Sequence, residues 1–358
     1  MKIVIIGSGG RLGAALTREY RDKFDVVGFN HAQLDLTNFE QVREKVTALD
    51  FDVLINCAAF TNVDLCETQR DLAFRINAEA PRVLAKICRE KKAKLIHFST
   101  DYVFDGEKRE PYTEDDVAKP ISFYGESKRE GEKLVLQTQD RPASRPEGSR
   151  LDQSAGSASF FDLGPSSTEL SPIEGAAGLG PVRRHLVVRV SWVFGPDRPS
   201  FIDGVIKRAR ENEHVEAIAD KFSTPTYTLD IAQMLLKVVA AVADRGSGGA
   251  GRGSSAAGVN DPGYSSDPGY SGILHFANAG ECSWQEYGQF ALDTCRSLGI
   301  SLKVKTVGAL KMADMKNWMA RRPVYSVLSA GKFFSRTGTT PRNWRDAVAD
   351  YVREFVTR

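Results

Sequence analysis

The sequence predicts an α/β fold built on a doubly wound parallel sheet. Two observations support this prediction. Short runs rich in Val and Ile alternate with helical patterns through the first 135 residues, and the same kind of apolar run returns near residue 185. Apolar runs that alternate with amphipathic helices are typical of a parallel sheet whose two faces are both covered by helices.

The expected elements follow one another along the chain. We expect strands at 2–7, 26–29, 52–58, 94–99 and 185–191, and helices from about Arg11, near 38–49, around 123–133 and near 228–243. Each expected strand is short and continuously apolar, which favours a position buried on both sides in such a sheet.

Two segments interrupt this order, at 139–182 and 245–272. Both are dominated by Ser, Pro, Gly and Ala, and the second contains the segment DPGYS twice. Segments with so few large apolar residues cannot bury enough surface to offset the entropy that ordering costs. We therefore interpret both as flexible surface insertions, whose deletion should change stability little.

Composition and charge limit the partners and the compartment that we expect for the protein. With a net charge of +2, the chain has no general attraction to nucleic acid or to an acidic membrane. Its five cysteines form no C-x-x-C pair, which is typical of reduced thiols in a cytoplasmic protein. No apolar run has the length of a signal-peptide core or a membrane helix. We expect a cytoplasmic protein with no nucleic-acid and no membrane partner.

The first strand runs into the sequence GSGGRLG, which places Gly7, Gly10 and Gly13 at G-x-x-G-x-x-G spacing. The first glycine permits a tight turn, the second lets backbone approach a pyrophosphate, and the third lets the helix pack on the strand. The start of the helix, with Arg11 and Leu12, offers N–H groups and a positive dipole end to the phosphates. This context between a strand and a helix predicts a Rossmann-type dinucleotide site.

The end of the second strand should select the cofactor. An acidic side chain there hydrogen-bonds the ribose 2′-hydroxyl of NADH and repels the 2′-phosphate of NADPH. Asn30 and His31 stand where that acid is expected, and no arginine stands beside them to bind the phosphate. The predicted cofactor is therefore NADPH or NADH, with a lean to NADPH.

A threonine, a tyrosine and a lysine follow in an order that points to a reductase. Thr100 ends the fourth strand, at the carboxyl edge where ligands bind in open α/β folds. Tyr124 and Lys128 lie four residues apart on the next helix and so share a face. The spacing alone often arises by chance and also fits an exposed helix turn. With strand, loop and helix in order, the set resembles the extended short-chain dehydrogenase/reductase superfamily.

That resemblance implies a role for each side chain. The phenol of Tyr124 gives a proton to a carbonyl oxygen while the nicotinamide delivers hydride to the carbonyl carbon. The ammonium of Lys128 lowers the pKa of Tyr124 from about 10 toward neutrality and holds the nicotinamide ribose. The hydroxyl of Thr100 binds the carbonyl and fixes its direction.

Seven blocks of sequence narrow the resemblance to the dTDP-4-dehydrorhamnose reductase family. They are NCAAFTNVDLCE, STDYVFDG, YGESKREGE, RVSWVFG, STPTYTLDIA, GILHFANAGECSWQEYGQFA and ARRPVYSVLS. The family reduces the 4-keto group of dTDP-6-deoxy-L-lyxo-4-hexulose to give dTDP-L-rhamnose. The resemblance therefore implies a dTDP-sugar substrate, and it implies a homodimer.

The resemblance also assigns binding residues. The sugar pocket would include Val63, Thr100, Asp101, Tyr102 and Trp192. Each has an alternative interpretation, because Trp192 also fits the core, Val63 fits loop packing and Asp101 fits a turn cap. The expected cofactor contacts outside the glycine loop are Asp35 and Leu36 at the adenine edge, and Ala58, Ala59 and Thr61 near the ribose and phosphate.

One departure from the family bears on metals. Some bacterial members share a magnesium ion between subunits through glutamates, one of them just past the glycine loop, where this chain has Ala15. The five histidines show no ligand spacing either, and His97 is expected to be packed core. We predict no metal.

Other functions remain open beside the reductase. Another NDP-sugar reductase or an NDP-sugar dehydratase would use the same loop and Tyr-Lys pair. Dehydratases, however, follow the threonine with Asp-Glu, where this chain has Asp101 and Tyr102. The regulatory β subunit of methionine adenosyltransferase resembles the same family and acts through association.

The resemblance finally implies two lobes. We expect residues 1–137, 185–195 and 228–243 to form the NAD(P)-binding Rossmann domain. Residues 196–226 and 273–330 would form a smaller C-terminal substrate-binding lobe. The chain would then cross between the lobes more than once.

Overall fold

The computed structural model of the chain describes residues 1–140, 185–243 and 270–356. The two segments interpreted as surface insertions, 139–182 and 245–272, lie almost entirely outside these residues. Helix α6 (Phe123–Asp140) runs up to the first segment, and strand β10 (Gly272–His275) begins where the second one ends.

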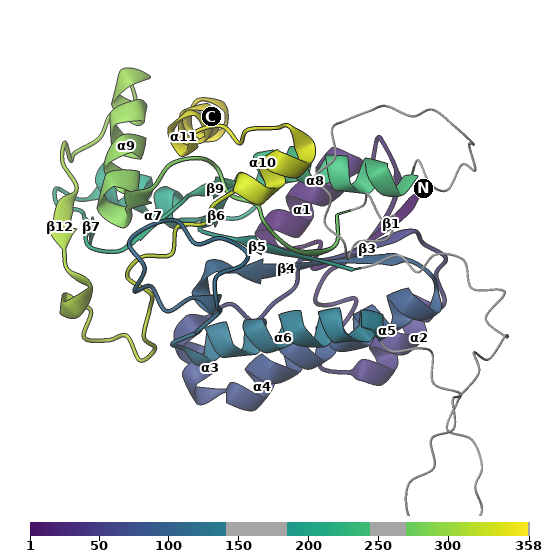
Figure 1. Cartoon of the computed structure of the whole chain (residues 1–358). Helices are drawn as coiled ribbons and strands as arrows, with labels where there is room; N and C mark the ends of the chain where they lie inside the picture. Colours follow the sequence, from purple (N-terminus) through teal and green to yellow (C-terminus); the bar gives the residue numbers. More distant parts are fainter. Residues whose placement is uncertain (141–184, 244–269, 357–358) are drawn as a thin grey trace, which may run out of the picture.

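A parallel sheet of six strands forms the centre of the main domain (Figure 1). Its strand order is β10-β5-β4-β3-β1-β2, and all neighbouring pairs are parallel. The five strands expected from the sequence are all present, as β1 (Lys2–Ile6), β2 (Asp25–Phe29), β3 (Val53–Asn56), β4 (Lys94–Thr100) and β5 (Leu186–Val190). The predicted doubly wound α/β class is confirmed. Because the order reverses at β1 and β3, a ligand crevice is expected at their carboxyl ends.

The sixth strand corrects one expected boundary. Residues 273–330 were assigned as a block to the smaller lobe, but β10 pairs with β5 and extends the main sheet. The strand is only four residues long. A Ser- and Gly-rich segment precedes this strand and separates it from the other strand patterns, so no local pattern assigns it to the main sheet.

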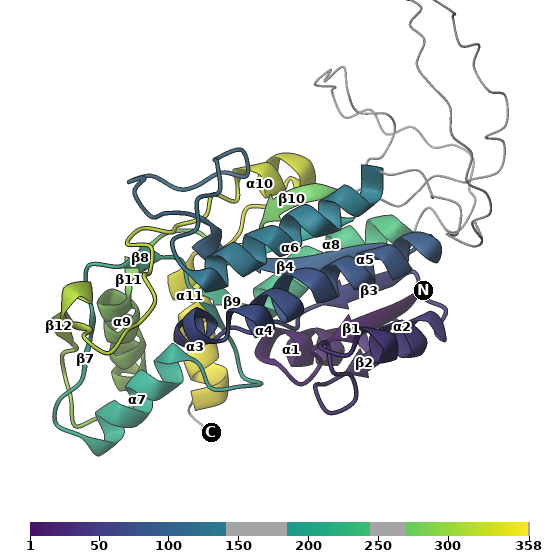
Figure 2. The same ribbon diagram turned by 90° about the horizontal axis from the view of Figure 1, so that it is seen from below.

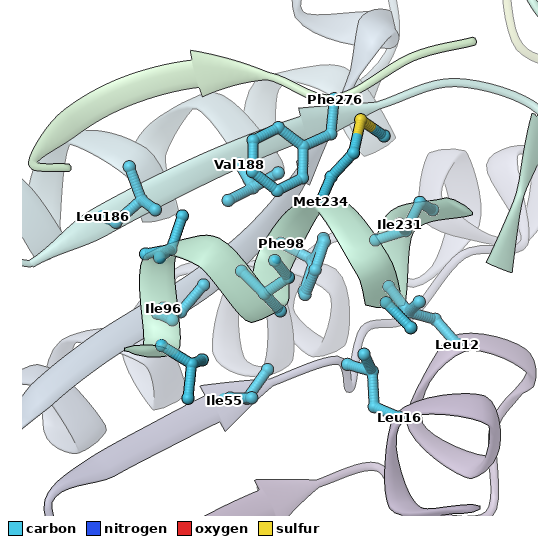
Figure 3. Packing of buried hydrophobic residues seen from close by; sticks show 14 of the residues in the cluster. Leu12, Leu16, Ile55, Ile96, Phe98, Leu186, Val188, Ile231, Met234 and Phe276 are labelled. Atoms are coloured by element: carbon cyan, nitrogen blue, oxygen red, sulfur yellow. The ribbon is translucent and has the colours of Figure 1, made fainter. Parts of the chain in front are cut away.

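Helices cover both faces of the sheet (Figures 1 and 2). One face carries α2 (Phe39–Thr47), α5 (Ala80–Glu90) and α6, and the other carries α1 (Arg11–Tyr20), α8 (Thr228–Ala243) and α10 (Gly331–Thr337). Figure 3 shows the second layer, in which Leu16 of α1 and Ile231 of α8 belong to the same buried cluster as the strand residues Ile55 and Ile96. Each such buried aliphatic side chain contributes about 1.5–3 kcal/mol. This packing makes the sheet edge a rigid base for a site.

A smaller lobe lies beyond the carboxyl edge of the sheet (Figure 1). Its core is rich in aromatic side chains, among them Tyr287, Trp344 and Tyr351. Its helices are α7 (Phe201–Glu211), α9 (Trp284–Ser297) and α11 (Trp344–Tyr351). Its strands pair two by two, as β6 (Val193–Phe194) with β9 (Thr226–Tyr227), β8 (Phe222–Ser223) with β11 (Cys282–Ser283), and β7 (Glu216–Ile218) with β12 (Gly308–Leu310).

Short helical segments complete the two lobes. They are α3 (Val63–Thr68), α4 (Arg70–Phe74), 3₁₀ turns at Asp101–Val103 and Met312–Asp314, and π-helical turns at Arg75–Glu79 and Val352–Val356. All five cysteines are free thiols, as their spacing predicted. Across residues 1–140, 185–243 and 270–356, no helix combines the length and apolarity needed to cross a bilayer.

Candidate active site

The glycine-rich turn joins β1 to α1. Gly7 has a φ of +81°, a left-handed conformation that favours glycine, and a Cβ there would lie 2.8 Å from the backbone nitrogen of Ala58. A Cβ on Gly13 would lie 2.2 Å from the carbonyl oxygen of Gly7. Glycine at these two positions is therefore what allows α1 to begin so close to the end of β1.

The N-terminus of α1 can receive an anion. Its N-cap, Gly10, offers no side-chain cap, and the first turn contains no acidic residue. The N–H groups of Arg11, Leu12 and Gly13 precede the first intrahelical bond, from Ala14 N–H to the carbonyl of Gly10, and so have no helical partner. An uncapped helix start behind a glycine turn fits the pyrophosphate of a dinucleotide.

The loop after β3 lies beside this turn. It carries Ala58, Ala59 and Thr61, the last of which is exposed. The N–H of Ala58 donates to Oδ1 of Asn56 at 3.1 Å, which fixes the loop where it leaves the strand. Ala58 therefore lies against the glycine turn, and Ala59 and Thr61 follow it in the same loop.

Asn77 holds the same loop from the other side, and the sequence did not single it out. Its Oδ1 accepts from the N–H of Phe60 at 2.8 Å, and its Nδ2 donates to the carbonyl oxygen of Phe60 at 3.0 Å. The same Nδ2 lies 3.0 Å from Oγ of Ser127 on α6. Asn77 sits in the π-helical turn Arg75–Glu79, and nothing in the local sequence marks that turn.

The end of β2 is open to solvent. Asn30 and His31 are exposed there. Asp35 is partly buried, and hydrogen bonds from the backbone N–H and then the hydroxyl of Thr37 lower the pKa of its carboxyl. Leu36 is only 5% exposed and packs in the core beneath α2. Of the two residues expected at the adenine edge, Leu36 therefore has its side chain turned inward.

Thr100 and Tyr124 meet at the carboxyl end of β4. Thr100 is the last residue of the strand, Tyr124 lies in the first turn of α6, and both are buried. The hydroxyl of Thr100 lies beside the phenol of Tyr124 and acts on its pKa. It also donates to Oδ1 of Asp101 at 3.1 Å and accepts from the N–H of Tyr102 at 3.2 Å. The structure thus brings together two of the three groups expected to carry the chemistry.

Burial raises the pKa of Tyr124, and the neighbouring hydroxyl of Thr100 only partly opposes this rise. The prediction that Lys128 draws this pKa toward neutrality is therefore wrong for this structure. The physical reason is that removing a phenolate from water costs more than the neighbouring groups return. A raised pKa keeps the phenol protonated at neutral pH, which is the form that a proton donor needs.

Lys128 is buried one helical turn further along α6. Its Nζ donates to the carbonyl oxygen of Phe98 at 2.7 Å and lies 3.3 Å from Nε2 of His97. Desolvation lowers the pKa of Lys128 to about 8, while the charge of Glu132 opposes the shift. The ammonium is thus held close to β4 and is easier to deprotonate than an exposed lysine.

His97 is packed in the core, as expected, and its ring also lies against Lys128. Nδ1 of His97 lies 3.1 Å from Nδ2 of Asn56, whose Oδ1 is already bonded to the N–H of Ala58. Because the amide nitrogen can only donate, Nδ1 must accept, and we assign the ring proton to Nε2 from this network. That proton faces Lys128, which disfavours the charged ammonium.

Asp101 points into the protein and joins the two lobes. Its Oδ2 accepts from Oγ of Ser223 at 3.1 Å and from Oγ of Ser326 at 2.6 Å. Burial raises the pKa of Asp101, and the charge of the fully buried Lys221 opposes that rise. Since Asp101 also accepts from Thr100, this network fixes the threonine relative to the smaller lobe.

Three residues expected in the sugar pocket, Tyr102, Val63 and Trp192, lie around Tyr124 and Lys221. The ring of Tyr102 lies 5.6 Å from that of Tyr124, and Val63 packs in the same small apolar cluster. Lys221 Nζ lies 5.1 Å from the Tyr102 ring and 5.6 Å from the Trp192 ring. Trp192 has a φ of 38°, and its buried indole nitrogen has no hydrogen-bond partner among the described residues. Trp192 also packs against the aromatic core of the smaller lobe, so both the sugar-pocket and the core interpretations stay open for it.

Comparison with known proteins bears on this site. A family model, the RmlD substrate binding domain, matches residues 1–143, 177–251 and 261–357. The chain is 32% identical to a dTDP-4-dehydrorhamnose reductase of Mycolicibacterium smegmatis, over 99% of this chain and 86% of that protein. It is 30% identical to a probable dTDP-4,6-dihydroxy-2-methyloxan-3-one 4-ketoreductase of Streptomyces antibioticus, over 99% and 96%. A dTDP-4-dehydrorhamnose reductase from Bacillus anthracis, crystallised with NADP, superimposes with a TM-score of 0.73 at 26% identity, over 99% of both chains.

Proposed function

The chain belongs to the RmlD substrate binding domain family, and on that premise we propose the reaction that its site performs. The chain is an NAD(P)H-dependent oxidoreductase that reduces the 4-keto group of dTDP-4-dehydrorhamnose to give dTDP-L-rhamnose. The names of several relatives and the NADP complex of one of them support this reaction. The uncapped start of α1 behind Gly7 and Gly13 supports the cofactor.

The side chains divide the work at the carbonyl. When bound, the reduced nicotinamide supplies the hydride that the carbonyl carbon accepts. Tyr124 donates its phenolic proton to the carbonyl oxygen as negative charge develops there. Thr100 orients the phenol and the carbonyl oxygen with its hydroxyl. Lys128 holds the nicotinamide ribose from the same face of α6.

One observation carries this proposal. Thr100 and Tyr124 are both buried and lie beside each other at the carboxyl end of β4, beside the crevice of the parallel sheet. The same observation counts against an exposed helix turn. Tyr102, whose ring packs on Tyr124, stands at the sequence position where dehydratases have glutamate, which counts against water elimination.

We further propose how the chain is divided around the substrate. Residues 1–137, 185–195 and 228–243, joined by β10, hold the cofactor, and residues 196–226 with 276–330 contact the sugar. The hydrogen bonds of Asp101 to Ser223 and Ser326 support a site between these parts. Free thiols at all five cysteines favour the cytoplasm as the place of action. The homodimer implied by the family is tested by the mass of the protein in solution.

A substrate panel tests the function. Purified protein is assayed with dTDP-4-dehydrorhamnose and with other dTDP-, UDP- and GDP-4-keto sugars, using NADPH and NADH. We expect dTDP-4-dehydrorhamnose to give the fastest cofactor oxidation. If no keto sugar increases cofactor oxidation, the proposal fails and an associating regulatory subunit becomes the better interpretation. Conversion of a dTDP-sugar without net cofactor oxidation would indicate a dehydratase instead.

Thr100→Val should lower turnover about tenfold. It removes a hydroxyl, and leaving the buried hydrogen-bond partners of that hydroxyl unpaired costs about 1–3 kcal/mol. Cofactor affinity should stay unchanged, since the effect is on the orientation of the phenol and carbonyl. Steady-state rates beside a cofactor titration measure both quantities. Thr100→Ser keeps the hydroxyl and should retain most of the activity. A serine variant as slow as the valine variant would show that the methyl group, not the hydroxyl, matters.

A further inference from the structure

A loop from the smaller lobe crosses the glycine-rich turn. It comprises residues 195–200, between β6 and α7. Asp197 forms an ion pair with Arg18 on α1, and the guanidinium of Arg11 donates to the carbonyl oxygens of Arg198 and Pro199. The loop is therefore fastened to both the first and the third turn of α1.

Arg198 of this loop reaches back over the turn. Its Nε donates to the carbonyl oxygen of Gly9 at 2.9 Å. A Cβ on Gly9 would lie 3.2 Å from Cβ of Asn30 and 3.9 Å from Nη2 of Arg198. The guanidinium and Asn30 therefore lie against the same glycine. The end of β2, where Asn30 stands, is where Rossmann-type sites distinguish a ribose 2′-hydroxyl from a 2′-phosphate.

The charged groups beside Gly9 and the end of β2 favour the binding of an anion. Arg198 is exposed, and among the described residues only its Nε has a hydrogen-bond partner. The neighbouring carboxylate, Asp197, is already paired with Arg18. Asn30 and His31 place no negative charge at the end of β2. A phosphate there would meet the planar fork of a guanidinium, with its terminal N–H groups available.

We propose that Arg198 binds the 2′-phosphate of NADPH and gives this chain a preference for NADPH over NADH. The inference rests on the proposed function, because it assigns one more residue to the cofactor of that reaction. The pyrophosphate has separate partners in the N–H groups that begin α1, so different elements bind the two phosphate groups. Since Arg11 and Asp197 already hold the loop, Arg198 loses little conformational freedom on binding.

Nucleotide binding without turnover tests this proposal. Wild type and Arg198→Ala are titrated with NADPH, NADH and adenosine 2′,5′-bisphosphate by calorimetry. Loss of a charge-assisted contact should weaken binding of NADPH and of the bisphosphate about 10- to 100-fold, and binding of NADH less than about threefold. Arg198→Lys keeps the charge but loses the fork, so its affinities should fall between these values. Arg208→Ala, which removes an exposed arginine from α7, is the matched control and should change none of them.

Two results would overturn the proposal. Equal weakening of NADPH and NADH would place Arg198 at the pyrophosphate, and unchanged affinities would show that Arg198 does not contact the cofactor. Both results differ from what would be observed if the proposed function itself were wrong. In that case the wild-type protein would bind neither dinucleotide, or would bind them and reduce no keto sugar.

Discussion

Tyr124→Phe should lower the rate of sugar reduction by about 10² to 10⁴, because it removes the only proton that this side chain can donate. The phenylalanine ring can keep the packing on Tyr102, whose ring lies 5.6 Å away. The fold and the affinity for NADPH should therefore survive. The measurement is sugar-dependent NADPH oxidation under single-turnover conditions, beside a titration of the variant with NADPH.

A second tyrosine gives a matched control. Tyr20 on α1 is buried and donates from its hydroxyl to the carbonyl oxygen of Ala232 at 2.8 Å, in the layer between α1 and α8. Tyr20→Phe removes a buried phenolic hydroxyl just as Tyr124→Phe does. It should cost about 1 kcal/mol of stability and leave turnover unchanged. If Tyr124→Phe retained wild-type turnover at unchanged NADPH affinity, another group would have to supply the proton, and the proposed mechanism would be wrong.

The parts of the site that the sequence predicted are those fixed by local geometry. Gly7 and Gly13 need glycine because of atoms within the same strand–turn–helix unit or directly beside it, so their spacing is readable along the chain. Tyr124 and Lys128 share one helix face, which their spacing also states directly. Thr100 could be placed because a run of apolar residues marks β4 and predicts where that strand ends.

The parts that the sequence did not predict depend on contacts between distant segments. The absence of an arginine next to Asn30 left the cofactor open, whereas the structure brings Arg198 to that place from the smaller lobe. Asp101 was open between a turn cap and a sugar contact, and its partners Ser223 and Ser326 come from segments far along the chain. No local pattern encodes such pairs, because they form only when the lobes pack together.

The raised pKa of Tyr124 illustrates the same limit in electrostatics. The family resemblance implied that the ammonium of Lys128 stands near the phenol of Tyr124, and Lys128 does lie on the same helix. Burial, however, is a property of the whole fold, and here it is the largest influence on the pKa of both Tyr124 and Lys128. The sign of a shift can be inferred from neighbours only when the extent of burial is also known.

Glu132→Gln should lower the free energy of unfolding by about 3–5 kcal/mol, because it leaves a buried guanidinium without its counter-charge. Glu132 on α6 and Arg189 on β5 form a two-pronged ion pair at 2.8 and 2.7 Å, and both side chains are only 3% exposed. The guanidinium of Arg189 also lies over the ring of Phe104, at 5.0 Å, on the buried side of the pair. The urea midpoints of wild type and variant measure the loss.

Two further variants separate this burial effect from an ordinary loss of charge on the same helix. Glu130 is partly exposed and pairs with the exposed Lys133 at 3.0 Å, so Glu130→Gln should change stability by less than about 1 kcal/mol. Replacing both partners, as Glu132→Leu with Arg189→Met, should restore much of the stability that Glu132→Gln loses, since no guanidinium is then left unpaired in the interior. If Glu132→Gln were no more destabilising than Glu130→Gln, the guanidinium would have to be reaching solvent. The packing of α6 against β5, which also positions Tyr124 and Lys128, would then be looser than the structure indicates.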